Sequence, residues 1–214
     1  MAASKKIASK QGIFIVFEGI DGSGKSTQAA RLAQTLSARH LDVTLTREPT
    51  DGVWGRKIRN IARAGRAGTS LEQEISYFIE DRKQHVREVI HPALRRGGVV
   101  ICDRYYYSTI AYQGALGADP ERLRRLNEKT HRFPKPDIVF YIDVSPSAGI
   151  RRINTQRDGA NAGYERAGFL TRVRAGFDAL DDACIIRVKG TRPRDAVARE
   201  ILAHVDGLMT AASG

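Results

Sequence analysis

Residues 13–39 read IFIVFEGIDGSGKSTQAARLAQTLSAR, and this stretch decides the fold. Its first six residues, IFIVFE, form an apolar run with β-branched and aromatic side chains, which predicts a buried strand. The glycines that follow predict a tight turn. QAARLAQTLSAR, at residues 28–39, has apolar side chains at helical spacing. The stretch therefore predicts a strand, a loop and a helix in direct succession.

The loop between this strand and this helix has the sequence of a phosphate-binding loop. Residues 19–26, GIDGSGKS, match the pattern G-x-x-x-x-G-K-[ST] in the required strand–loop–helix context. Glycines let backbone N–H groups converge on phosphate oxygens, Lys25 reaches the β- and γ-phosphates, and the Ser26 hydroxyl is a ligand for Mg²⁺. The motif predicts an ATP or GTP site with Mg²⁺ but leaves the phosphoryl acceptor open. The loop residues expected at this site are Gly19, Asp21, Gly22, Ser23, Gly24, Lys25, Ser26 and Thr27.

The alternation of strand and helix patterns continues along the rest of the sequence. Further strands are predicted at residues 41–46, 99–103, 137–144 and 184–188. Further helices are predicted at residues 57–63, 71–95, 108–114, 121–132, 168–179 and 194–209, and from residue 147 onward. Such hydrophobic strands predict an α/β fold of three layers, in which helices flank a mainly parallel five-stranded sheet as in P-loop NTPases. Ligands are then expected at the carboxyl ends of the strands.

Composition and charge narrow the class of protein. The chain has 214 residues, of which 42% are hydrophobic, and its formal net charge is +11. We expect one globular domain over residues 12–214, preceded by a flexible tail of residues 1–11. The charge favours anionic partners but does not choose among nucleic acid, membranes and small phosphorylated substrates. Cys102 and Cys184 lie in apolar runs and are expected to be buried thiols. No apolar run approaches the ~20 residues that span a bilayer, so we expect a cytoplasmic protein.

Three further clusters follow predicted strands or lie close to them. They are TREP at residues 46–49, DRY at residues 103–105 and STIAYQ at residues 108–113. Together with GIDGSGKST they resemble the thymidylate kinase family of P-loop nucleoside monophosphate kinases, over about residues 13–177. The resemblance implies ATP-dependent phosphorylation of dTMP to dTDP, for dTTP and DNA synthesis, by a homodimeric enzyme that uses ATP and Mg²⁺.

The resemblance implies roles for charged residues beside the phosphate-binding loop. Arg47 and Arg104 would hold the phosphate of dTMP, which a guanidinium fork fits in bidentate fashion. Asp103 and Asp21 would lie near the sugar and Mg²⁺, with Asp103 joining Ser26 at the metal. The alternatives are surface charges after strands for the two arginines, and simple support of the loop for Asp21.

The base and sugar contacts of the family fall on two predicted helices. Phe78 and Arg82 are four residues apart and share a helix face, matching the pair that stacks on thymine and hydrogen-bonds its carbonyl. A helical Phe is also a common core residue, so that alternative stays open. Tyr112 resembles the aromatic residue that crowds the ribose 2′ position. The remaining residues expected around dTMP are Ser108, Thr109, Gln113 and Tyr164, where Thr109 replaces an amide residue of some members.

The resemblance also implies a mobile lid at about residues 151–166. The nucleophile is a monophosphate that is mostly dianionic at neutral pH, so the reaction needs positive charge rather than a general base. Lys25, Arg104 and Arg47 supply part of that charge. Some members carry a further catalytic arginine in the phosphate-binding loop, but Gly22 stands there in this chain. The lid must then supply the arginine, and Arg157 is the first choice among Arg151, Arg152, Arg157 and Arg166.

Two features stay open within the resemblance. TREPTDGVWG departs from relatives that have two glycines after the proline, and Trp54 in it is unexplained unless it is a core residue. Lys189, in KGTRP at residues 189–193, lies where the family's loop passes the adenine of ATP, although a connecting turn is an equal alternative.

Two other functions are weighed against this one. Another P-loop kinase would act on a different nucleotide or on a deoxynucleoside, but a free hydroxyl acceptor would need a carboxylate base rather than two arginines that grip phosphate. A nucleotide-switched ATPase that binds nucleic acid would explain the positive charge. It would leave Phe78, Arg82 and Tyr112 without a purpose. We therefore expect no stable nucleic-acid or membrane partner.

Overall fold

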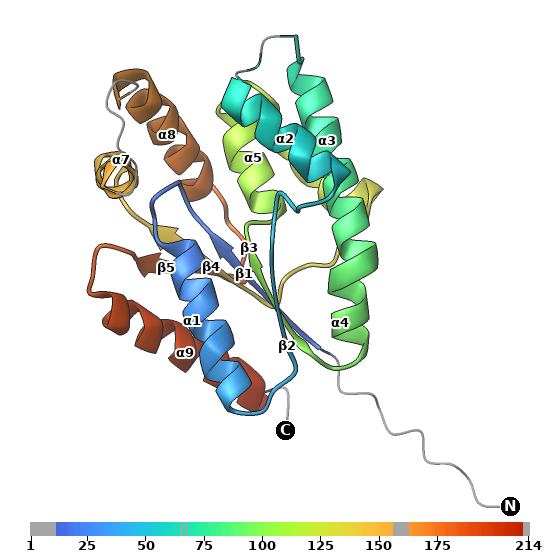
Figure 1. Cartoon of the computed structure of the whole chain (residues 1–214), viewed down its shortest axis with the longest axis vertical. Coiled ribbons are helices and arrows are strands. Elements are labelled where there is room, and N and C mark those ends of the chain that lie inside the picture. Colours follow the sequence, from blue (N-terminus) through green and yellow to red (C-terminus); the bar gives the residue numbers. More distant parts are fainter. Residues whose placement is uncertain (1–11, 65, 67, 156–162, 212–214) are drawn as a thin grey trace, which may run out of the picture.

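Five parallel strands form one sheet in the order β2-β3-β1-β4-β5 (Figure 1). The computed structural model describes residues 12–64, 66, 68–155 and 163–211, with the side chains of residues 64 and 163–166 outside the description. The strands are β1 (Ile13–Glu18), β2 (Val43–Arg47), β3 (Val99–Asp103), β4 (Ile138–Asp143) and β5 (Ile185–Lys189). The predicted parallel sheet of five strands is confirmed.

Helices fill the connections between the strands. They are α1 (Lys25–Ala38), α2 (Val53–Ala64), α3 (Leu71–His85), α4 (His91–Arg95), α5 (Tyr106–Gly114), α6 (Pro120–Arg125), α7 (Pro146–Asn154), α8 (Gly163–Asp178) and α9 (Arg194–Ala211). Two π-helical segments, η1 (Val86–Ile90) and η2 (Leu126–Thr130), follow α3 and α6. Among the described residues, no helix combines the length and the apolar character needed to span a membrane.

The central strand β1 shows why the protein folds in three layers. Phe14 and Val16 belong to one buried cluster, which includes residues of α3, α5 and α8. Ile15 and Phe17 belong to a second cluster, which includes residues of α1 and α9. Because successive side chains of a strand point to opposite faces, an entirely apolar strand needs helices on both faces of the sheet. Figure 1 shows α1 and α9 on one face and α3, α4 and α5 on the other.

Two helices differ from the sequence-based expectation, one in its winding and one in its first residue. The run predicted at residues 71–95 begins with a capping box formed by Ser70 and Gln73, but it changes winding at η1 before α4. The helix predicted at residues 57–63 begins earlier, at Val53. Apolar spacing at a period of 3.6 residues describes only regular α-helix, so it does not predict a π-helical turn.

The carboxyl ends of the strands meet at one edge of the sheet. Arg47 pairs in register with Asp103, which in turn pairs with Phe17 one residue before Glu18. On the other side of β1, Asp143 pairs with Lys189. The polar residues that follow the strands are therefore gathered at the edge where the sequence analysis expects the ligands.

Candidate active site

The loop at residues 19–24 has the backbone of a phosphate cradle. Gly19, Gly22 and Gly24 have φ angles of 142°, 78° and 97°, which residues other than glycine rarely adopt. At Gly22, a Cβ atom would overlap the backbone carbonyl of Gly149 in α7. The loop is therefore packed tightly against α7, and a side chain at position 22 has no room.

Lys25 begins α1 beneath this loop. The residue is buried, and its Nζ donates to the carbonyl oxygen of Ile20 at 3.4 Å. Burial, followed by the positive charge of Arg104, lowers the pKa of Lys25 to about 8. An ammonium group held in a poorly solvated position interacts strongly with any phosphate that enters the loop.

A cavity of about 300 Å³ opens beside the phosphate-binding loop. Gly22, Ser23, Gly24, Lys25, Ser26 and Thr27 line one side of it, and Arg152, Gly190, Arg192 and Val197 are among the residues on the other. Arg152 closes the loop onto the β5–α9 connection: its Nη1 donates to Ser23 O at 3.0 Å and its Nη2 donates to Gly190 O at 2.8 Å. Lys189, predicted here, is exposed and does not line this cavity.

Ser26 and Asp103 form the predicted metal pair. The Ser26 hydroxyl donates a hydrogen bond to Asp103 Oδ2, while Asp103 Oδ1 is buried without a hydrogen-bond partner in the described part of the chain. A hydroxyl and a carboxylate with an unpaired oxygen are the hard oxygen ligands that Mg²⁺ prefers, completed by waters and substrate phosphates. The described residues contain no group of three or more His, Cys, Asp or Glu side chains that could hold a metal ion by themselves. The donor set therefore fits Mg²⁺ bound together with a nucleotide.

Arg104 lies between the phosphate-binding loop and α5. Its φ angle of 72° turns the side chain out of the strand direction, and its guanidinium donates to Gly19 O at 3.2 Å, Asp21 Oδ1 at 2.6 Å and Ser108 Oγ at 3.0 Å. It also donates to the Tyr112 hydroxyl at 3.2 Å. The structure thus brings together four of the residues expected at dTMP, and Asp21 pairs with this arginine.

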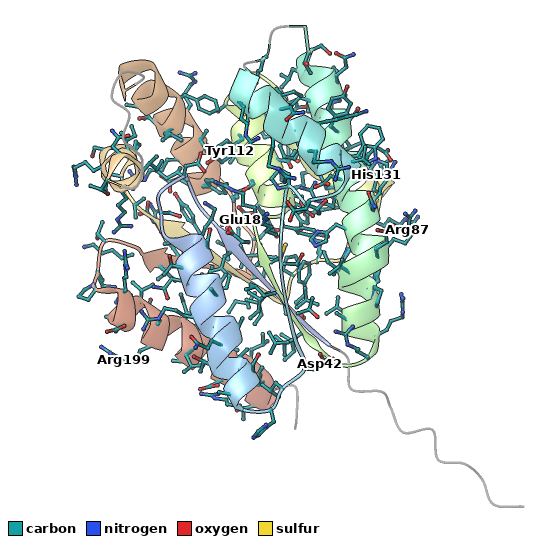
Figure 2. All side chains as sticks on the ribbon, viewed as in Figure 1. Glu18, Asp42, Arg87, Tyr112, His131 and Arg199 are labelled. Atoms are coloured by element: carbon teal, nitrogen blue, oxygen red, sulfur yellow. The ribbon has the colours of Figure 1, made fainter. Side chains whose placement is uncertain are left out.

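Glu18 is a site residue that the sequence analysis missed. Figure 2 shows it in the interior of the molecule. Its Oε1 accepts hydrogen bonds from the backbone N–H groups of Tyr105 and Ser108 at 2.8 and 3.0 Å, and its Oε2 accepts from Ser108 Oγ at 2.5 Å. A strand residue therefore caps the first turn of α5, which has no side-chain cap of its own. Burial raises the pKa of Glu18 to about 7, against the opposing effects of Ser108 and Arg104. A charged residue ending an apolar strand was the available signal.

Arg47 lies apart from the contacts of Arg104. Its side chain is 63% exposed, and Nη2 donates to both carboxylate oxygens of Asp51 at 2.9 and 3.0 Å. It lines a cavity of about 570 Å³ that also includes Ser26 and Asp103 but not Arg104. Arg104, the other arginine expected to hold the same phosphate, is therefore not among the residues that line this cavity with Arg47.

Arg82 is held in a buried network that joins α3 to α5, to η2 and to the segment that follows β2. Its Nε and Nη2 donate to Glu48 Oε2 at 2.9 and 2.6 Å, Nη2 also donates to Thr109 Oγ1 at 3.1 Å, and Nη1 donates to Asn127 Oδ1 at 2.7 Å. His85 Nδ1 completes the network, 3.0 Å from Glu48 Oε1. Burial raises the pKa of Glu48, but the charges of Arg82 and His85 outweigh it, so the pKa lies below its usual range.

The network leaves Arg82 with one unused donor. A guanidinium has five N–H bonds, and the described contacts occupy four of them. The fifth is on Nη1. Phe78, one turn earlier on α3, is half-buried and lies in neither core cluster, which disfavours the core alternative.

Gln113 and Tyr112 are two further residues of α5 that the sequence analysis expects at dTMP. Gln113 Nε2 donates to Glu74 Oε1 at 3.2 Å, and Gln113 Oε1 is buried without a hydrogen-bond partner among the described residues. The Tyr112 ring meets Phe169 and Phe177 of α8 edge-on, at 6.1 and 6.3 Å between centroids. Figure 2 shows Tyr112 in the region between α5 and α8. Glu48, Glu74, His85 and Asn127 were not predicted individually, because buried polar partners carry no local sequence pattern.

The lid expectation falls largely outside the described residues. Arg157 is not described, and for Tyr164 and Arg166 the structure describes no side chain. Arg151 is exposed, whereas Arg152 is half-buried in the contacts given above. Trp54 is not a core residue: it is half-buried on α2, with its ring 5.6 Å from that of Tyr77 and with Lys57 Nζ 4.3 Å above it.

The comparisons with known proteins agree on one family. The family model for thymidylate kinase matches residues 17–201. The chain is 40% identical over 192 residues to a thymidylate kinase of Akkermansia muciniphila, covering 90% of each chain. It is 37% identical over 203 residues to that of Desulfotalea psychrophila, covering 95% of this chain and 98% of the other. A crystal structure of thymidylate kinase from Ehrlichia chaffeensis superposes with a TM-score of 0.72 at 32% identity, covering 92% of this chain and 99% of the other. The chain therefore belongs to the thymidylate kinase family.

Proposed function

We propose that the protein transfers the γ-phosphoryl group of ATP to dTMP and so produces dTDP. The hydrogen bond from Arg104 to Gly19 carries this proposal, because it joins the arginine expected at the acceptor phosphate to the first glycine of the donor loop. Membership of the thymidylate kinase family supports the same acceptor and donor. The two phosphates would then meet between Lys25 and Arg104.

The chain's own residues account for most of the positive charge that the reaction needs. The acceptor phosphate of dTMP is mostly dianionic at neutral pH, since its second pKa is about 6. Arg104 would hold this dianion, and Lys25 would bind the β- and γ-phosphates of ATP. Mg²⁺, held by Ser26 and Asp103 with the phosphates, would neutralise part of the charge that develops on the transferring group. The lid arginine Arg157 would supply the rest, since Gly22 has no room for a side chain.

The acceptor base would be read by residues of α3 and α5. Phe78 would stack on thymine, and the unused Nη1 donor of Arg82 would hydrogen-bond a base carbonyl. Tyr112 would crowd the 2′ position of the sugar, so that a ribonucleotide would fit less well. Arg47 would reach the acceptor phosphate after leaving Asp51, an exposed pair of the kind that contributes about 1 kcal/mol or less.

Several finer features are part of the same proposal. We expect Mg²⁺ as the metal, a homodimer as the assembly, a cytoplasmic location, and no stable nucleic-acid or membrane partner. The switch ATPase has less support, because it gives the buried network around Arg82 no role. A different acceptor is disfavoured by the family.

One experiment tests the proposed acceptor. The purified chain is incubated with ATP and Mg²⁺ and with dTMP, dUMP, dCMP, dAMP, dGMP, UMP or thymidine in turn, and the products are separated. The proposal predicts strong preference for dTMP, weaker use of dUMP and no reaction with thymidine. Transfer to none of these acceptors, or preference for another of them, would contradict it.

A further inference from the structure

A buried amide in the acceptor site has one hydrogen-bonding atom without a partner. Gln113 on α5 is 2% exposed, and its Oε1 accepts no hydrogen bond in the part of the chain that the structure describes. A buried acceptor left unpaired costs free energy, so nearly all such atoms in folded proteins have partners. The unpaired oxygen therefore marks a place where a ligand would supply a donor.

Glu74 decides which atom of this amide is left over. Gln113 Nε2 donates to Glu74 Oε1 at 3.2 Å, and Glu74 is itself 4% exposed. Arg66 holds the carboxylate from the other side, with Nε at 2.8 Å from Oε2 and Nη2 at 3.3 Å from Oε1. An ionised carboxylate only accepts hydrogen bonds, so Gln113 must turn its NH₂ group toward Glu74 and its carbonyl oxygen away.

We propose that Glu74 is a positioning residue that makes Gln113 an obligatory acceptor and thereby selects a base with an N–H at the ring position between its two carbonyls. The proposal deepens the assigned function, since it rests on dTMP being the acceptor and on α3 and α5 reading its base. Glu74 itself would touch no substrate, but it would decide which amide atom of Gln113 faces the base.

The polarity of the site distinguishes thymine from cytosine. Thymine presents an N3–H donor beside a 4-carbonyl acceptor, whereas cytosine presents an N3 acceptor beside a 4-amino donor. The fixed Gln113 carbonyl matches the N3–H, and the spare Nη1 donor of Arg82 matches the 4-carbonyl. Cytosine would place its N3 acceptor against the Gln113 acceptor and its 4-amino donor against the Arg82 donor, leaving buried polar groups unpaired.

The test is the substitution Glu74→Gln. A glutamine at position 74 both donates and accepts, so the Gln113 amide gains the freedom to turn and to offer Nε2–H to a base. The probe pair is dTMP and 5-methyl-dCMP, which share the 5-methyl group and differ at the edge in question. We expect the ratio of their dissociation constants to fall about tenfold, the size expected from the loss of one good hydrogen bond. Most of the change should be tighter binding of 5-methyl-dCMP, with ATP binding unaltered.

A matched control lies on the same helix. Glu72 is two residues away on α3, is exposed, and accepts two hydrogen bonds from Arg122, each at 2.7 Å. Glu72→Gln should leave the ratio unchanged. In a Gln113→Ala background, Glu74→Gln should also have no further effect on the ratio, because the amide it orients is absent.

Calorimetric titration of each variant, with thermal unfolding recorded in parallel, decides the outcome. An unchanged ratio in Glu74→Gln, or an equal loss of affinity for both nucleotides, would overturn the proposal and leave Glu74 a structural residue. A wild-type chain that does not distinguish the two nucleotides would overturn it as well. If the wild-type chain binds dTMP selectively but transfers no phosphoryl group, the proposed function fails while the positioning role is still decided by the ratio.

Discussion

Gly22 in the phosphate-binding loop and Gly149 in α7 pack backbone against backbone, with no space for a Cβ atom on either residue. A Cβ on Gly149 would lie 2.6 Å from the carbonyl oxygen of Asp21, and one on Gly22 would overlap Gly149 itself. The contact couples the loop proposed to hold the ATP phosphates to the helix that leads into the proposed lid.

The glycine contact predicts that side chains are not tolerated at position 22. Gly22→Ala adds a Cβ at a φ angle of 78° as well as the overlap, so it should lower the free energy of unfolding by about 2–4 kcal/mol. It should weaken ATP binding as well, because the cradle has to shift. Urea denaturation and ATP titration would measure both effects. A variant as stable as the wild type would show that the loop and α7 separate easily.

The proposed Mg²⁺ ligands Ser26 and Asp103 predict that Asp103→Asn lowers activity and weakens Mg²⁺ binding. The amide keeps the size of the side chain and an oxygen, but it removes the negative charge that favours a divalent cation. We expect kcat to fall by about two orders of magnitude and the Mg²⁺ concentration for half-maximal activity to rise. Asp206→Asn, the same change at an exposed carboxylate on α9 that pairs with Arg39, serves as the control. Equal Mg²⁺ dependence in all three proteins would exclude Asp103 as a ligand.

Glu18 predicts a pH-dependent contribution to stability. Its pKa is about 7 in the folded chain and near 4.5 when it is unperturbed, so the folded state binds its proton more tightly. The free energy of unfolding should therefore decrease as the pH rises from about 4.5 to about 7. Glu18→Gln removes this titration. The difference in the free energy of unfolding between the two proteins should therefore change by about 3 kcal/mol across that range. Parallel curves of stability against pH would show that Glu18 titrates normally.

The buried pair of Glu48 and Arg82 predicts strong destabilisation when one partner is removed. Both side chains are at most 3% exposed, and the remaining charge would be buried without its counterion. Arg82→Met or Glu48→Leu should each lower the free energy of unfolding by about 3–5 kcal/mol. The double variant should lose less than the sum of the two. Additive losses measured by urea denaturation would indicate that the pair is not coupled.

The sequence predicted most of the fold and the position of part of the candidate site. The apolar strands and the loop GIDGSGKS indicate the parallel sheet and the position of Lys25, since both depend on local patterns. Motifs likewise predicted Ser26, Asp103 and Arg104, which the structure gathers at one sheet edge. Motif order did not predict that Arg47 would turn toward Asp51.

The sequence could not predict the residues that support the site, for a physical reason. Glu18 caps a helix that begins 88 residues later, and Asn127 contacts Arg82 from a separate π-helical segment. Such contacts depend on how elements pack rather than on spacing within one element. Buried carboxylates such as Glu48 and Glu74 look like ordinary surface charges in the sequence, and the fold alone reveals that they hold Arg82 and Gln113.

The division of the site into a donor half and an acceptor half is tested most directly by Arg104→Ala. Steady-state kinetics would be recorded with ATP and dTMP varied independently, and ATP binding would be titrated in the absence of dTMP. The account predicts that kcat/KM for dTMP falls at least about a hundredfold while the dissociation constant of ATP stays within about twofold of the wild type. An equal loss of affinity for ATP, or an unchanged kcat/KM for dTMP, would contradict it.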